Sequence, residues 1–167
     1  MEVTSIHSFL HYYERIRERT NALVRIIPHD HLDWTYLPGK FTVGDQVRHI
    51  ATMERYMFAE TIAGRQSAYK GCGKDLADGY ENVVTFFNAL HVQSLTIFKS
   101  LQDDDVTRKC TTPGGTEITV GKWLRAMVEH EIHHRGQLYL YLNMLGVKTP
   151  PMFGLTAEEV AQRSIHI

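Results

Sequence analysis

Histidines in the last third of the chain have the residue types and the spacing of a metal site. Within residues 129–137, His130 and His134 are four positions apart. On a helix, residues at this spacing lie on one face, so both imidazoles can reach the same ion. Imidazole ligands suit zinc, nickel and iron. The sequence therefore predicts a site for a divalent metal ion and leaves the identity of that metal open.

The same residues also match H-E-x-x-H, the signature of zinc proteases, in which the glutamate is the general base. The extended form of that motif requires a glycine and a third histidine downstream. Gln137 and Leu140 occupy those two positions here, and no segment resembles the β-edge that holds a peptide substrate. The protease interpretation is therefore disfavoured. Glu131 remains the candidate catalytic proton acceptor, with a helical ion pair to Arg135 as the alternative.

A helical wheel separates the histidines of this segment. The apolar residues of a helix predicted over residues 119–145 place His134 near the centre of the buried face, with His130 and Glu131 within roughly 70° of it. His133 lies more than about 100° away and is expected to face solvent. An unpaired polar group in a core costs about 1–3 kcal/mol. Either a metal ion or a buried polar network would supply the missing partners, and the pattern leaves both open.

His49 is the candidate third ligand. It lies in a second predicted helix, which begins at Thr42 with a capping-box pattern and runs to about residue 64. His49 falls at the border of the apolar face, where a side chain reaches a neighbouring helix. His7 and His11 are also four residues apart, but they lie opposite the apolar face of the first helix and are expected to face solvent.

The elements that must position these side chains are helices. Apolar residues recur at helical spacing in four long segments, 4–27, 42–64, 79–101 and 119–145. A short fifth helix is expected after Thr156, and a small hairpin is expected on either side of a Pro-Gly-Gly turn between residues 106 and 119. The sequence therefore predicts an all-α four-helix bundle with one or two long crossovers and a short extra C-terminal helix, forming one domain over residues 1–167.

Composition argues against several classes of protein. The chain has 167 residues, of which 43% are hydrophobic, and a net charge of −1. It has no long basic stretch, so no nucleic-acid partner is expected. No apolar run is long enough for a membrane span, and the N-terminus lacks a secretory pattern, so we expect a cytoplasmic protein. Cys72 and Cys110 are expected to be free thiols.

With these features, the chain resembles the DinB-like (DNA-damage-inducible) superfamily of metalloenzymes, which includes YfiT-like proteins and thiol-dependent S-transferases. The resemblance covers nearly the whole chain. It rests on the length, the four helices, the run V-R-H-I around His49 and the run H-x-x-x-H-R-G-Q that begins at His130. The resemblance implies an up-up-down-down bundle, a homodimer, and one divalent metal ion on His49, His130 and His134. It does not extend to Glu131 or His133.

Three neutral imidazoles leave a divalent ion with open positions, where it can lower the pKa of water or activate a thiol. By resemblance, the expected function is transfer of a low-molecular-weight thiol, such as bacillithiol or mycothiol, to a small electrophilic substrate. Metal-dependent hydrolysis is the alternative reaction, and a non-catalytic metal-binding protein of the stress response is an alternative of another kind. Gln46 and Gln137 are expected to hydrogen-bond the ligands. Trp34, Tyr36 and Phe153 are loop aromatics that are expected either to wall the substrate pocket or to cap the core.

Overall fold

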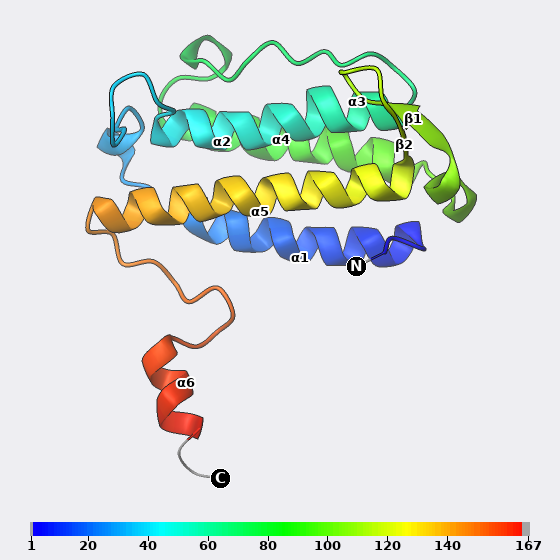
Figure 1. Cartoon of the computed structure of the whole chain (residues 1–167). Coiled ribbons are helices and arrows are strands. Elements are labelled where there is room, and N and C mark those ends of the chain that lie inside the picture. The colour runs from blue at the N-terminus through cyan, green and yellow to red at the C-terminus, as the bar shows by residue number, and fades with distance from the viewer. Residues whose placement is uncertain (1, 165–167) are drawn as a thin grey trace.

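The computed structural model describes residues 2–164, so Met1 and residues 165–167 of the expected domain lie outside the described part of the chain. Four long helical segments lie side by side (Figure 1). The second segment is α2, which continues without a break through a π-helical turn, Met53–Phe58, into α3. The long helices are α1 (Ile6–Val24), α2 (Val43–Thr52) with α3 (Ala59–Ile62), α4 (Tyr80–Lys99) and α5 (Val120–Met144). The all-α bundle expected from the sequence is confirmed.

Local signals in the sequence set the ends of these helices. Thr42 accepts a hydrogen bond from the Asp45 backbone, and the Asp45 side chain accepts one from the Thr42 backbone, which completes the predicted capping box of α2. The hairpin is also confirmed, with β1 (Lys109–Thr111) paired antiparallel to β2 (Glu117–Thr119) and Cys110 opposite Ile118. Short 3₁₀ turns cover 29–31, 74–76 and 103–107.

The directions of the helices differ from the expected up-up-down-down order. The backbone of Ile6, at the start of α1, donates to Asp103, which follows the end of α4. Gly121, at the start of α5, lies against Val3 and Val106 at the same end of the bundle. Arg108 also reaches the carbonyl of Ile62 there, where α3 ends. The order is therefore up-down-down-up.

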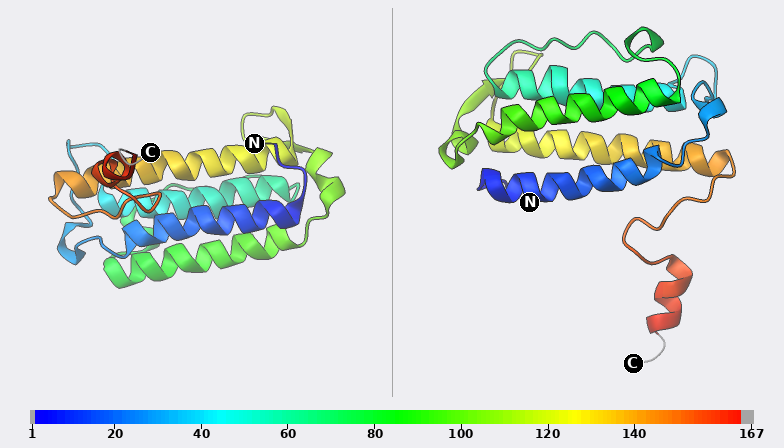
Figure 2. Two further views of the ribbon diagram at one scale, coloured as in Figure 1. Left: turned by 90° about the horizontal axis from the view of Figure 1, so that it is seen from below. Right: turned by 180° about the vertical axis from the view of Figure 1, so that it is seen from behind.

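Two connections explain this order. The segment between α1 and α2 reverses direction at one end, around the 3₁₀ turn 29–31. The segment between α3 and α4 instead runs back along the whole bundle, as Figures 1 and 2 show. A helix of 20 residues is about 30 Å long, and an extended segment of about 17 residues is long enough to cover that distance. The molecule thus has one long crossover.

The C-terminal helix α6 (Ala157–Ser164) stands apart from the bundle (Figures 1 and 2). Thr156 caps it, as expected, by accepting a hydrogen bond from the backbone of Glu159. Every residue of α6 is exposed to solvent. Within the described residues, no helix has the length and hydrophobicity needed to cross a membrane. Cys72 and Cys110 are free and buried, as predicted.

The core consists of two apolar clusters, one toward each end of the bundle. One is built around Phe9, Phe98 and Leu124, and the other around Leu23, Phe87 and Leu138. Between them lies a layer of buried polar side chains contributed by all four long helical segments. We call it the polar layer; it comprises Tyr13, Arg17, Thr20, Glu54, His91 and Glu131.

Candidate metal centre

The three histidines singled out in the sequence converge between α2 and α5. One ring nitrogen from each of His49, His130 and His134 lies within 4.8 Å of the other two. The Nε2 atoms of His49 and His130 are 3.2 Å apart. The ring centroid of His134 is 4.5 Å from those of both other histidines. All three side chains are half-buried, so the cluster is shielded but remains open on one side.

The spacing of these nitrogens fits coordination of one ion. Imidazole nitrogens bind zinc at about 2.0–2.1 Å, so two ligands in tetrahedral geometry stand about 3.3 Å apart. The 3.2 Å between the Nε2 atoms of His49 and His130 is close to that value. The donor set is also chemically consistent, because three imidazoles suit zinc, nickel or iron. The residues present therefore fit the metal that the sequence predicted.

Neighbouring side chains orient two of the rings. The Nδ1 atom of His134 is 2.8 Å from Oε1 of Gln46, and because that oxygen can only accept, His134 donates from Nδ1. Its Nε2 is then left with a lone pair for a metal. The Nδ1 atom of His49 is 3.0 Å from the hydroxyl of Tyr69, which turns the Nε2 of His49 toward His130. Such partners fix the tautomer and the orientation of metal ligands.

The surroundings keep the three imidazoles neutral. Burial lowers the pKa of His130 to about 3, and repulsion from the other histidines acts in the same direction. Burial, again with repulsion from His49 and His133, lowers the pKa of His134 to about 4. Burial also lowers the pKa of His49. A histidine must be unprotonated to bind a metal, so near neutral pH all three rings are in the form that a metal needs.

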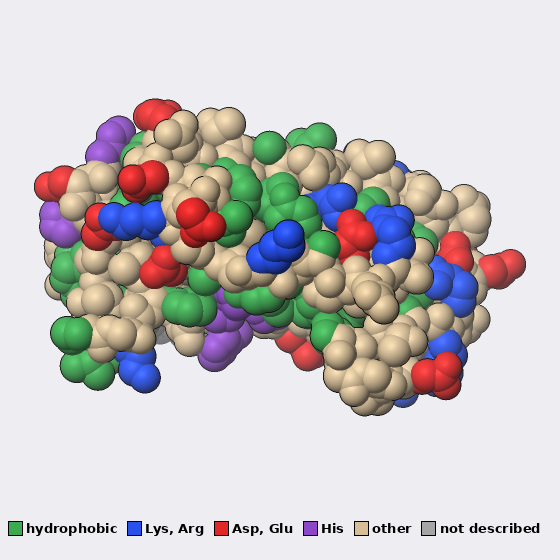
Figure 3. All heavy atoms as spheres, turned by 90° about the horizontal axis from the view of Figure 1, so that it is seen from above, with side chains coloured by type: hydrophobic (Ala, Val, Ile, Leu, Met, Phe, Trp, Pro, Cys, Tyr) green, Lys and Arg blue, Asp and Glu red, His purple; other side chains and the backbone are tan. Residues whose placement is uncertain are grey.

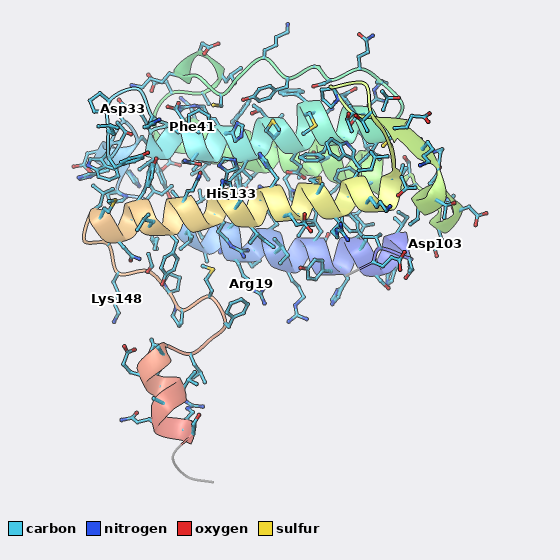
Figure 4. The ribbon with its side chains drawn as sticks, viewed as in Figure 1. Arg19, Asp33, Phe41, Asp103, His133 and Lys148 are labelled. Carbon is cyan, nitrogen blue, oxygen red and sulfur yellow. The ribbon has the colours of Figure 1, made fainter. Side chains whose placement is uncertain are left out.

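His133 on α5 (Figure 4) is exposed, as the wheel predicted, and its ring centroid lies 5.0 Å from that of His134. The wheel was wrong about the centre of the buried face. That place belongs to Glu131, with 2% exposure, whereas His134 lies at the border. The error arose because the centre of the wheel was set from the apolar residues alone, so the buried Glu131 did not contribute to it. Gln46 hydrogen-bonds His134, as expected, and the amide of Gln137, which lies 3.0 Å from Nε2 of His133, also interacts with His134.

Glu131 belongs to the polar layer. Its carboxylate accepts hydrogen bonds from the Tyr13 hydroxyl at 3.0 Å and from the Thr20 hydroxyl at 2.6 Å, and it lies 3.1 Å from Arg17. The expected pair with Arg135 is replaced by these contacts with α1. Glu131 is not among the residues that converge with the histidines. A catalytic proton transfer by Glu131 stays a prediction, and the H-E-x-x-H match lacks the geometry of a protease.

Sequence reasoning missed the partners of Glu131 in the polar layer. The Arg17 guanidinium forms a buried ion pair with Glu54, and His91 contacts the other oxygen of Glu54 at 2.8 Å. The side chains of Arg17 and Glu54 are each 2% exposed. The sequence did contain a signal, because several predicted helices carry polar residues on their inner faces. That signal does not indicate which of these side chains contact one another.

A groove of about 800 Å³ begins at His49. Its walls include Met53 and Met57 from the π-helical turn, Trp123 from α5, Tyr69 from the long crossover, and the hairpin turn 112–116. Figure 3 shows a group of histidine side chains beside hydrophobic ones at one edge of the molecule. Volumes in this range are typical of small-molecule sites. The histidine cluster therefore adjoins, through His49, a space large enough for a small molecule.

The pocket walls expected from the sequence were wrong. Trp34 and Tyr36 pack edge-on against Tyr141, and Phe153 is 81% exposed with Arg19 over its ring. None of the three lines the groove at His49. The groove is walled instead by residues of the helices that carry the histidines, by the crossover and by the hairpin turn.

The fold and the site together define a class: a four-helix bundle that gathers three histidines from two helices beside a groove. Residues 12–138 match the model of the DinB superfamily, so the chain belongs to this family. The sequence is 26% identical to YjoA of Bacillus subtilis (strain 168) over 143 residues, which are 82% of this chain and 88% of YjoA.

Solved structures have the same fold. A DinB-like protein from Bacillus cereus ATCC 10987 superposes with a TM-score of 0.76 at 19% identity, covering 89% of this chain and 97% of its own. For Bacillus subtilis YjoA the TM-score is 0.70 at 22% identity, covering 87% and 96%. The mycothiol-dependent maleylpyruvate isomerase is more distant, with a TM-score of 0.55 at 15% identity, covering 81% and 63%.

Proposed function

We propose that this protein binds one divalent metal ion through His49, His130 and His134 and transfers a low-molecular-weight thiol to a small electrophilic substrate. The observation that carries the proposal is the convergence of three neutral ring nitrogens within 4.8 Å, on the wall of an open groove. A divalent ion held by three imidazoles keeps open positions and lowers the pKa of a thiol or water that it coordinates.

The chain itself prepares the site for such an ion. Gln46 and Tyr69 hold the rings of His134 and His49 so that their Nε2 atoms face the centre of the cluster. Met53, Met57 and Trp123 border the approach to His49 with largely apolar surface. Rings fixed in advance lower the entropic cost of binding an ion.

A thiol is favoured over water as the nucleophile because a structural relative, the maleylpyruvate isomerase, is by its name mycothiol-dependent. In the proposed transfer, the thiol sulfur forms the new bond to the electrophilic carbon. The leaving group departs with the electron pair of the broken bond, and the thiol proton passes to solvent. The position of Glu131 in the polar layer supports a structural role for it in place of that of proton acceptor.

The test is consumption of a thiol in the presence of chlorodinitrobenzene, a model electrophile, by protein loaded with zinc, nickel or iron in turn. Thiols of several classes, including bacillithiol and mycothiol, are compared. The proposal expects chloride release that depends on the thiol, the metal and the protein. His134→Ala should abolish it, whereas His133→Ala should retain it.

The outcomes distinguish the competing functions. Metal-dependent hydrolysis of an ester substrate without any thiol requirement would replace the transferase by a hydrolase. A metal-loaded protein that accelerates neither reaction would favour a non-catalytic metal-binding protein. A protein that takes up no divalent ion would overturn all three.

A further inference from the structure

The groove beside His49 has a specific chemical character. It follows α2 into the π-helical turn, where Met53 and Met57 lie one and two turns beyond His49. Trp123 comes from α5, seven residues before His130 and therefore on the same face of the helix. Thioether side chains are flexible and polarizable, and they make favourable contacts with aromatic rings. The groove thus offers aromatic and thioether surface next to the metal centre.

The polar side chains along this groove already have partners in the protein. The indole Nε1 of Trp123 donates to the hydroxyl of Thr61 at 2.8 Å. The hydroxyl of Tyr69 faces Nδ1 of His49, and that of Ser67 donates to the backbone carbonyl of Tyr56. Thr112 accepts from the backbone of Thr116. A ligand in the groove would find few free donors or acceptors.

Charged side chains are also missing from this surface. None of the described residues that line the groove is a lysine, arginine, aspartate or glutamate. The nearby cations Arg55 and Arg65 are both paired with Glu60. Transfer of a charged group from water into such a place, without a partner, is costly. The groove therefore selects against ions of either sign.

We propose that the groove formed by Met53, Met57, Tyr69, Trp123 and the hairpin turn 112–116 binds an uncharged aromatic substrate and presents it to the metal centre. Calling the occupant a substrate rests on the proposed function, whereas its chemical class rests on the groove alone. The electrophile is accordingly a neutral aromatic compound.

Trp123 supplies a direct readout. In the Trp34→Phe variant it is the single tryptophan, because the chain contains two. Nitroaromatic compounds quench tryptophan fluorescence, and three of similar size differ in charge: para-nitroanisole, para-nitrobenzenesulfonate and para-nitrophenyltrimethylammonium. They are titrated into metal-free protein, so that coordination of the probe by a metal cannot contribute. We expect saturable quenching by the neutral probe, with a dissociation constant at least about tenfold lower than for either ion.

Two variants locate the binding. Met53→Lys places a charge in the groove and should weaken binding of the neutral probe about tenfold or more. Val92→Lys introduces the same charge on the exposed face of α4 and should leave binding unchanged, since Val92 is 62% exposed and far from the groove in sequence. If Met53→Lys unfolds, as judged by circular dichroism, Thr116→Lys in the exposed hairpin turn replaces it and should have the same effect.

Equal or tighter binding of a charged probe, or quenching that does not saturate, would overturn the inference. The inference would also be overturned if the groove variants and Val92→Lys bound the neutral probe with the same affinity. These results are independent of the proposed function, because they require neither metal nor thiol. Selective binding of the neutral probe without thiol transfer would support the groove assignment and contradict the proposed transferase function. Thiol transfer without selective binding would contradict the groove assignment alone.

Discussion

Gln46 and Tyr69 determine which ring nitrogen two of the histidines present to the metal centre. Gln46 accepts from Nδ1 of His134 and is almost fully buried, with 2% exposure. Because the amide oxygen fixes the tautomer, the Nε2 lone pair of His134 is available before any ion arrives. The orientation of His134 therefore depends on a residue outside the cluster of three histidines.

Replacing Gln46 tests this dependence. Gln46→Leu removes the acceptor at similar volume, so His134 loses its fixed orientation and the affinity for zinc should fall about 10–100-fold. Isothermal titration calorimetry measures the change. Gln137→Leu is the comparison variant, because its amide lies 3.0 Å from Nε2 of the exposed His133, and its affinity should fall much less. Equal loss in both variants would contradict the orienting role.

The convergence of His130 and His134 was predictable from the sequence because a spacing of four residues fixes one face of a helix. The prediction that His49 joins them required a further assumption. A polar side chain at the border of an apolar helix face was assumed to reach the neighbouring helix. The partner Tyr69 was not predictable. It meets His49 only through the path of the crossover, which a single sequence does not specify.

At the scale of the elements, the polar layer ties the four long helical segments together at one level. Arg17 is its centre, between the carboxylates of Glu54 and Glu131, with its guanidinium 4.4 Å from the ring of Phe87. A sliding of one helix against another would leave buried charges without partners, which costs several kcal/mol. The layer thus favours the register that places His49 opposite His130.

Glu131→Gln tests whether Glu131 serves the fold or the chemistry. The amide removes a charge from the neighbourhood of Arg17 and should lower the free energy of unfolding by about 1–3 kcal/mol, measured with urea. The rate of thiol transfer per metal-loaded molecule should stay within about twofold of the wild type, because the carboxylate contacts α1 and not the histidines. A lost rate with unchanged stability would instead establish Glu131 as the proton acceptor.

Glu60 gives the junction of the π-helical turn and α3 a defined dependence on pH. Its carboxylate bonds Arg65 and Arg55, and these interactions lower its pKa from 4.5 to about 2. A carboxylate with a lowered pKa in the folded state stabilises the fold above the unfolded value and loses that contribution as pH falls from 4.5 toward 2.

Glu60→Gln should accordingly cost about 1–2 kcal/mol of stability at pH 7 and almost nothing near pH 2. Urea unfolding at both values measures the two differences. Glu117→Gln, at an exposed position of β2, is the control and should have little effect at either pH. A cost that persists unchanged at pH 2 would show that charge is not its source.

At the scale of the whole molecule, the sequence predicted the number of helices, their approximate ends and the hairpin. These features depend on periodicity, capping residues and turn residues, all of which are local. The directions of the helices depend on which connection crosses the bundle. The two connections, 25–42 and 63–79, are of similar length. The amino-acid sequence alone therefore does not show that only the second runs along the length of the bundle.

The C-terminal segment makes a further prediction about the whole molecule. No residue of α6 is buried, so a chain that ends at Leu155 should unfold at the same urea concentration as the full chain and bind zinc with the same affinity. A loss of more than about 1 kcal/mol would contradict the independence of α6 from the bundle. Light scattering on both chains tests the homodimer implied by the family resemblance, which stays a prediction.

Metal content tests the central claim most directly. The protein is purified without a metal-affinity column, stripped with a chelator and titrated with zinc, with His134→Ala and His133→Ala in parallel. We expect one zinc ion per chain in the wild type and in His133→Ala, and none at the same concentrations in His134→Ala. Absence of zinc binding by the wild type, or equal loss in the two variants, would contradict the assignment of His49, His130 and His134 as one metal centre.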